Sequence, residues 1–191
     1  NRPSAPTAPV DVPAPLAHAL DSLALSKRRG SASARDTLVE LTDFFCPGCA
    51  SANERLRARI DNAVRDGRLL HIVWEIPFQR GSAEVSVAAD CVWSDDQERY
   101  WDYRDVLFDA QRAVMASYPV SEQLLRLAQR EGVDSTRLSS CIRSRGGETT
   151  LRLRRAVDVA LGEKVPFTPV FWLNGREAPV ARVDSALMVG R

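Results

Sequence analysis

Two cysteines separated by two residues are the feature of this chain best suited to chemistry. Cys46 and Cys49 lie in the segment VELTDFFCPGCASANERL, directly after an apolar run and directly before a helical pattern. The thiolate is the reactive form of cysteine, and the unpaired N–H groups and dipole at a helix N-terminus stabilise it. Cys49 falls one helical turn later and deeper, so one sulfur can attack a disulfide while the other resolves it.

Other uses of this cysteine pair are less well supported. A zinc ribbon needs a second C-x-x-C or clustered histidines. The remaining cysteines, Cys91 and Cys141, are single and distant, and the only histidines are His18 and His71. A passive disulfide is uncommon at a helix start that follows a core strand. We therefore favour redox chemistry without a metal or an organic cofactor, because the two sulfurs carry both electrons.

Composition excludes several classes of function. A chain of 191 residues can bury one full core, with room for an inserted subdomain. The formal net charge is +1 and no basic stripe dominates, which argues against nucleic acid as a partner. No apolar run reaches the roughly 20 residues that span a bilayer.

The N-terminal segment is unlike the rest of the chain. Residues 1–15 contain five prolines and little that can pack. We interpret residues 1–36 as a partly disordered leader or tether, with a short helix in LAHALDSLAL and folded structure from Thr37 onward. The chain starts at Asn1, so we expect that a signal peptide, a membrane anchor or another upstream segment has been removed.

The remaining pattern predicts a small sheet interrupted by helices. Buried strands are expected in TLVELTDF and LLHIVWEI, joined by a helix from the CPGC motif to Arg65. PFTPVFWLNG then predicts a strand and hairpin, followed by a short strand APVARV and a helix from Asp184. Between these halves, with breaks at Gly132 and Gly146-Gly147, helices are expected at 82–94, 97–116, 121–131, 134–144 and 148–161.

This order predicts an α/β fold. The first half forms a parallel β-α-β unit with a right-handed crossover, and the second half is an antiparallel hairpin. Residues 37–81 and 164–191 would build the sheet domain, and residues 82–163 would be an inserted helical domain.

Together these motifs resemble a known family. ELTDFFCPGC, TPVFWLNG and the segment DCVWSDDQERYWDYRDVLFDAQ resemble the DsbA-like thiol–disulfide oxidoreductases of the thioredoxin superfamily, over roughly residues 37–180. The resemblance implies a thioredoxin-like fold with an inserted helical domain. It also implies a periplasmic or otherwise extracytoplasmic bacterial protein that transfers disulfides to or from exported proteins.

The resemblance assigns roles to individual positions. Cys46 matches the exposed nucleophile and Cys49 the buried resolving cysteine. Pro169 matches the cis-proline, and Thr168 would offer backbone groups to a bound substrate strand. Glu40 matches a buried acidic residue, for which we expect a raised pKa and a part in moving the Cys49 proton.

Three departures or additions qualify this match. Pro47 and Gly48 supply no histidine between the cysteines, so the pair should be less oxidising than in strong oxidants of the family. Phe167 stands where many relatives carry glycine, and its ring could narrow the substrate groove or supply an apolar contact. Some relatives have a second disulfide in the insertion. Cys91 and Cys141 could form it, and we favour this over two buried free thiols.

The leading functional hypothesis is a monomeric oxidase. Its partners would be exported or unfolded proteins with free thiols and a membrane redox partner, DsbB-like or of another kind. The same parts could serve a reductase or isomerase. A different class, a chaperone-like peptide-binding module, has no need of a resolving cysteine. A glutathione-dependent transferase usually lacks the second cysteine, so Cys49 counts against it.

Overall fold

A five-stranded mixed sheet forms the centre of the molecule. The computed structural model describes residues 11–188. The strand order is β1-β3-β2-β4-β5. The central strand β2 pairs in parallel with β3 and antiparallel with β4, while β1 and β5 are antiparallel edge strands. The bounds are β1 (Ser26–Arg29), β2 (Asp36–Thr42), β3 (Leu69–Glu75), β4 (Val170–Leu173) and β5 (Arg176–Glu177). The predicted parallel unit and antiparallel hairpin are both present.

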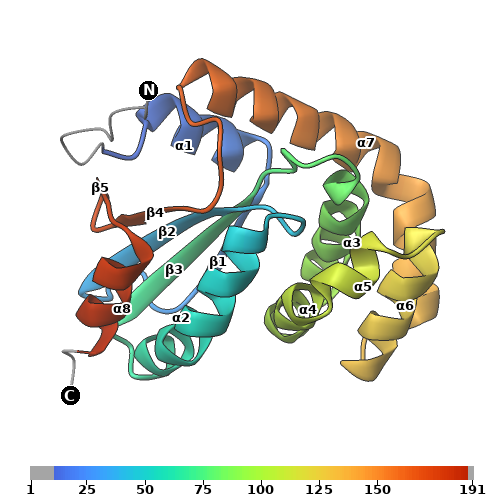
Figure 1. Cartoon of the computed structure of the whole chain (residues 1–191), viewed down its shortest axis with the longest axis horizontal. Helices are drawn as coiled ribbons and strands as arrows, with labels where there is room; N and C mark the ends of the chain where they lie inside the picture. The colour runs from blue at the N-terminus through green and yellow to red at the C-terminus, as the bar shows by residue number, and fades with distance from the viewer. Residues whose placement is uncertain (1–10, 189–191) are drawn as a thin grey trace.

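Helices cover both faces of this sheet (Figure 1). On one face lie α2 (Pro47–Arg65) and α8 (Val180–Met188), and on the other lie α1 (Ala14–Ser22) and the C-terminal half of α7 (Ser135–Gly162). Along β2, Leu38 packs with the α2 face, whereas Val39 and Leu41 pack with α1 and α7. Because side chains alternate along a strand, Glu40 and Thr42 point to the α2 side.

The helical insertion packs beside the sheet (Figure 1). Its first four helices are α3 (Ser82–Asp95), α4 (Gln97–Asp109), α5 (Gln111–Met115) and α6 (Val120–Arg130), and α7 completes it. One apolar cluster joins Phe44, Cys49 and Val73 of the sheet half to Tyr103 and Leu107 of the insertion. The two halves therefore share a core beside the cysteine pair. The domain boundaries given above stay a prediction.

The N-terminal prediction needs correction. Folded structure begins before Thr37, because α1 and β1 belong to the fold and Leu16 and Leu20 are fully buried. Lys27 is only 1% exposed and forms ion pairs of 3.3 Å with Glu75 and 3.4 Å with Asp90. The charge of Lys27 can be buried because it has these acidic partners on distant elements. Residues 1–10 of the expected leader lie outside the described residues.

The predicted break at Gly146-Gly147 is wrong. Helix α7 continues without interruption from Ser135 to Gly162. A Cβ atom at Gly146 would lie 3.5 Å from a methyl group of Val87, an ordinary van der Waals distance, so α7 packs against α3 here without a need for glycine. Glycine lowers helix propensity by about 1 kcal/mol, and packing against α3 outweighs that cost.

Two further boundaries differ from the prediction. The helix expected at 97–116 divides at Ala110 into α4 and α5. The segment APVARV is not a strand, because α8 begins at Val180 and the N–H of Val183 bonds to the carbonyl of Pro179 at 3.2 Å. The partner of β4 in the hairpin is the short strand β5.

Candidate active site

Cys46 lies at the junction of the sheet and the first turn of α2. It is the residue immediately before that helix, and its carbonyl accepts from the N–H groups of Cys49 at 3.1 Å and Ala50 at 3.2 Å. Both cysteines are free thiols, as in the reduced state of such a pair. The Cys46 thiol donates a hydrogen bond of 3.2 Å to the carbonyl oxygen of Thr168. Sequence motifs more than a hundred residues apart therefore meet at one sulfur atom.

The two thiols have opposite acidities. A hydrogen bond from the Cys49 thiol is the main cause that lowers the pKa of Cys46 to about 6, and the N–H groups of Cys49 and Gly48 contribute. Burial, together with donation to Cys46, raises the pKa of Cys49 well above its ordinary value. Cys49 is fully buried. At neutral pH Cys46 is therefore the thiolate and Cys49 the thiol.

A cis-proline loop borders this site. The Thr168–Pro169 peptide bond is cis. A Cβ atom on Gly48 would lie only 3.2 Å from Cδ of Pro169, so the glycine lets this loop approach the start of α2. Phe167, directly before the loop, is 56% exposed. Its ring is free to contact a bound chain.

Glu40 is buried as expected, but its expected raised pKa is wrong. Arg104 of α4 donates to Oε1 of Glu40, and Nε2 of His71 donates to Oε2 at 3.0 Å. Burial alone would raise the pKa of Glu40, but the charge of Arg104 and the hydrogen bond from His71 lower it to about 2. The carboxylate stays ionised at neutral pH, so Glu40 cannot relay the Cys49 proton there.

The partners of Glu40 form a buried network. Burial lowers the pKa of His71 to about 4, and its neutral ring accepts from Nε of Arg29 at 3.3 Å while donating to Glu40. Arg104 also donates to Oδ1 of Asn53 on α2 at 2.6 Å. The network therefore joins β1, β2, β3, α2 and α4 through buried polar contacts.

Thr42 and Asp43, shortly before the C-x-x-C motif, both influence the acidity of Cys49. Thr42 is fully buried, and its hydroxyl oxygen has no hydrogen-bond partner within residues 11–188. It nevertheless lies near enough to the Cys49 thiol to lower the pKa of that group, although the two do not meet the geometry of a full hydrogen bond. Burial raises the pKa of Asp43, whose carboxyl accepts from the N–H groups of Phe45 at 2.8 Å and Gln79 at 2.7 Å. Sequence reasoning missed both residues, although strand alternation placed Thr42 on the same side as Glu40.

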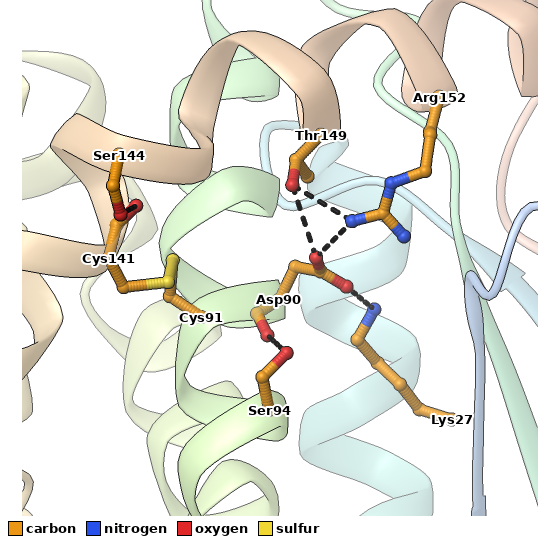
Figure 2. Close-up of a disulfide and its surroundings, with 8 residues drawn as sticks. All are labelled: Lys27, Asp90, Cys91, Ser94, Cys141, Ser144, Thr149 and Arg152. Carbon is orange, nitrogen blue, oxygen red and sulfur yellow. Dashed lines mark hydrogen bonds and ion pairs between the residues drawn. A yellow bond between two sulfur atoms is a disulfide. The ribbon is translucent and has the colours of Figure 1, made fainter.

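Cys91 and Cys141 form a disulfide between α3 and α7, as favoured from the sequence, with an S–S distance of 2.02 Å (Figure 2). Beside it, Asp90 accepts from Arg152 of α7 at 2.9 Å and lies in the interior. The disulfide and this ion pair cross-link α3 to α7. Their arrangement supports a structural role for the second cysteine pair.

Within residues 11–188, no three side chains of histidine, cysteine, aspartate or glutamate are grouped as a metal site requires. None of the helices in this part of the chain combines the length and apolar character of a membrane span.

A family model and several known proteins match this chain. A family model described as Thioredoxin matches residues 25–187. The chain is similar to an Na(+)/H(+) antiporter NhaA 3 of Salinispora tropica, with 30% identity over 155 residues, which are 78% of this chain and 21% of that protein. It thus spans about a fifth of the length of the antiporter. It is also similar to a probable disulfide bond formation protein D of Bacillus anthracis, with 24% identity over 145 residues, 74% of this chain and 66% of that protein.

Solved structures show the same fold. BdbD from Bacillus subtilis in its oxidised form superposes with a TM-score of 0.71 and 18% identity, over 87% of this chain and 92% of that chain. The thioredoxin-like fold predicted from the sequence is confirmed by this likeness.

Proposed function

The chain belongs to the thioredoxin family, and on that premise we propose that it is a thiol–disulfide oxidoreductase acting through Cys46 and Cys49. A substrate thiolate attacks Sγ of Cys46 in the oxidised pair, and Cys49 leaves as a thiolate. A second substrate thiolate then attacks the mixed disulfide, which releases Cys46 as a thiolate and the substrate as a disulfide. The Cys46–Cys49 disulfide accepts both electrons from the substrate, so the reaction requires no further prosthetic group.

One observation carries this proposal. Cys46 lies at the N-terminus of α2, 3.2 Å from the Thr168 carbonyl of a cis-proline loop, with a pKa lowered to about 6. A cysteine that only packs in the core has no use for a stabilised thiolate beside a half-buried backbone loop. Cys49, with its raised pKa, is suited to stay protonated until it resolves or re-forms the disulfide.

The proposed direction is oxidation of exported proteins. A lowered thiolate pKa stabilises the reduced pair and so makes its disulfide more oxidising. The site has no histidine between its cysteines, which places the expected potential below that of the strongest oxidants. Reduction or isomerisation is the competing direction, because exchange is reversible.

The proposed partners follow from the same site. A substrate chain would pair with the backbone of Thr168 beside Pro169, and the exposed ring of Phe167 would contact its apolar side chains. Disulfides persist outside the cytoplasm, so the proposed substrates are exported proteins whose cysteines are still reduced. A membrane redox partner would re-oxidise the pair after each cycle, and the enzyme would act as a monomer.

Three proteins test the reaction. The wild-type protein should oxidise a dithiol peptide stoichiometrically, and C46S should lose this activity completely. C49S should accumulate a mixed disulfide between Cys46 and the peptide, visible as an added mass that a reductant removes. If C46S retained full activity, or if the wild-type pair did not cycle, the oxidoreductase proposal would be wrong. Suppression of aggregation that survives in C46S would instead favour the chaperone-like module.

The direction is tested by equilibrium with glutathione. The pair is equilibrated in buffers of defined glutathione ratio, and the trapped thiols are counted by mass. A potential near about −120 to −200 mV supports disulfide donation, whereas a value near about −250 mV or below supports a reductase.

A further inference from the structure

Gln111, the first residue of α5 in the insertion, reaches the active-site turn. Its side chain is 7% exposed, and its Nε2 atom donates to the carbonyl of Phe44 at 2.7 Å and to the carbonyl of Cys46 at 3.0 Å. One amide group therefore bonds to the carbonyls of the two residues on either side of Phe45. The bonds cross 67 and 65 residues of sequence.

The same turn is held from the sheet side by Asp43. Its carboxyl accepts from the N–H of Phe45 at 2.8 Å, and its carbonyl accepts from the N–H of Cys46 at 3.0 Å. Asp43 therefore accepts hydrogen bonds from backbone N–H groups of the turn, and Gln111 donates hydrogen bonds to its carbonyl groups. Buried backbone groups require such partners, because an unpaired one costs about 1–3 kcal/mol.

From this geometry we infer that Gln111 is a positioning residue, through which the helical insertion holds Cys46 in its reactive placement. The inference rests on the proposed function and adds a determinant of its chemistry. The carbonyl of Cys46 also accepts the first two hydrogen bonds of α2. Fixing that carbonyl fixes the first turn, and with it the N–H groups of Gly48 and Cys49 that face the sulfur.

The surroundings of Gln111 explain why no simple substitute is available. A cleft of about 520 Å³ lies between the start of α2 and the α4–α5 junction, and Gln111 forms part of its wall together with Pro47 and Arg112. A shorter side chain at position 111 would not reach both the Phe44 and the Cys46 carbonyls. The turn would then exchange two fixed donors for mobile water.

The test replaces the amide and follows the Cys46 thiolate. Q111M keeps the length of the side chain and removes both donors. Q129M is the matched control, because Gln129 is an exposed residue of α6. The thiolate of each reduced protein is titrated by its ultraviolet absorbance. We expect the acid dissociation constant of the Cys46 thiol to fall about tenfold in Q111M. This is the effect of losing one aligned hydrogen bond from the first turn of α2 to the thiolate. In Q129M the constant should stay unchanged.

A second readout is the exchange equilibrium with glutathione. A less stable thiolate disfavours the reduced pair, so the equilibrium constant of Q111M should shift about tenfold toward the oxidised form, which corresponds to about 30 mV. A merely structural role would lower the unfolding midpoint of Q111M and leave both readouts unchanged, and that result would overturn the inference. The thiolate titration does not require catalysis, so it still decides if the proposed function fails.

A second variant covers a failure of Q111M to fold. Q111N retains the amide but is one methylene shorter, so it cannot reach both carbonyls. It should fold and show the same direction of change in both readouts. If folded Q111N kept the wild-type titration and the wild-type equilibrium, position 111 would have no role in placing Cys46.

Discussion

The Sγ atom of Cys46 lies 3.2 Å from the carbonyl oxygen of Thr168, to which it donates a hydrogen bond while it is a thiol. The carbonyl belongs to the cis-proline loop, so the nucleophile and the nearest backbone acceptor for a substrate chain share one location. A chain that pairs with this loop would bring its own sulfur beside Cys46. Under the proposed function, substrate binding and chemistry would meet at this contact.

The acidity of Cys46 predicts a pH profile. With a pKa of about 6, alkylation of the reduced protein by iodoacetamide should rise as pH increases through 6 and be nearly constant from about pH 7 to 8. The variant C46A isolates Cys49, whose raised pKa should make alkylation slow over the whole range. A half-maximal rate near pH 8.5 in the wild-type protein would show an ordinary thiol and contradict this prediction.

The ion pair of Glu40 and Arg104 predicts a large effect on stability. R104M leaves a carboxylate buried without its partner and should lower the free energy of unfolding by about 3–5 kcal/mol. E40Q combined with R104M should restore part of this loss, because no unpaired charge is left. Urea denaturation at neutral pH gives the free energy of unfolding of the wild-type protein, R104M and the double variant. A loss below about 1 kcal/mol for R104M, the range of surface pairs, would show that the pair is not buried as described.

The same network predicts sensitivity to acid. The folded pKa of His71, about 4, lies below its ordinary value of about 6.5, so the unfolded chain binds a proton that the folded protein excludes. Stability should therefore fall as pH decreases from about 6.5 to 4. Glu40, with a folded pKa of about 2, contributes stability that is lost as pH falls from about 4.3 toward 2.

Denaturation midpoints measured between pH 7 and pH 3 test this acid sensitivity, and E40Q supplies the comparison. Below about pH 4.3 the midpoint of E40Q should decrease less steeply than that of the wild-type protein. Equal slopes in that range would remove Glu40 from the explanation.

Much of the site could be predicted from local sequence, and its electrostatics could not. The C-x-x-C spacing, the apolar run before it and the Thr168-Pro169 pair are short patterns with a direct structural meaning. The acidity of Glu40 depends on Arg104, which lies 64 residues away on another element. Whether a buried carboxyl has a raised or a lowered pKa depends on such a partner, and spacing along one strand carries no information about it.

The errors in the fold have a related cause. SKRR appeared to be an exposed polar segment because charged residues are seldom buried without partners. Lys27 has two acidic partners on other elements, and they allow β1 to pair with β3. Gly146 likewise gave a local signal for a break, but α7 continues through it, packed against α3 and joined to it by the Cys91–Cys141 disulfide. Local patterns failed where distant contacts supply the compensating interaction.

The disulfide between Cys91 and Cys141 predicts a loss of stability that leaves the active site unchanged. The bond closes a separation of 50 residues, and in the chain-entropy model such a loop is worth about 4 kcal/mol. The variant C91A/C141A should lose stability of this order in urea denaturation, while its Cys46 thiolate should titrate with the wild-type midpoint. A shift of that midpoint would give the second cysteine pair a role in the chemistry.

The unpaired hydroxyl of Thr42 predicts a role for this residue when Cys49 leaves as a thiolate. The hydroxyl is buried, has no partner within residues 11–188, and acts to lower the pKa of Cys49. T42V has nearly the same shape but cannot donate, so reduction of the oxidised protein by a dithiol peptide should slow roughly tenfold, as for loss of a hydrogen bond to a charged group. T42S retains the donor and should react at nearly the wild-type rate.

The trapped-thiol assay at short times measures these rates, and unfolding midpoints show whether both variants are folded. The comparison of valine with serine separates donation from packing, because T42S removes a methyl group and keeps the hydroxyl, whereas T42V does the opposite. Slow reduction in T42S with normal reduction in T42V would show that the methyl group, and not the hydroxyl, is what the site requires at this position.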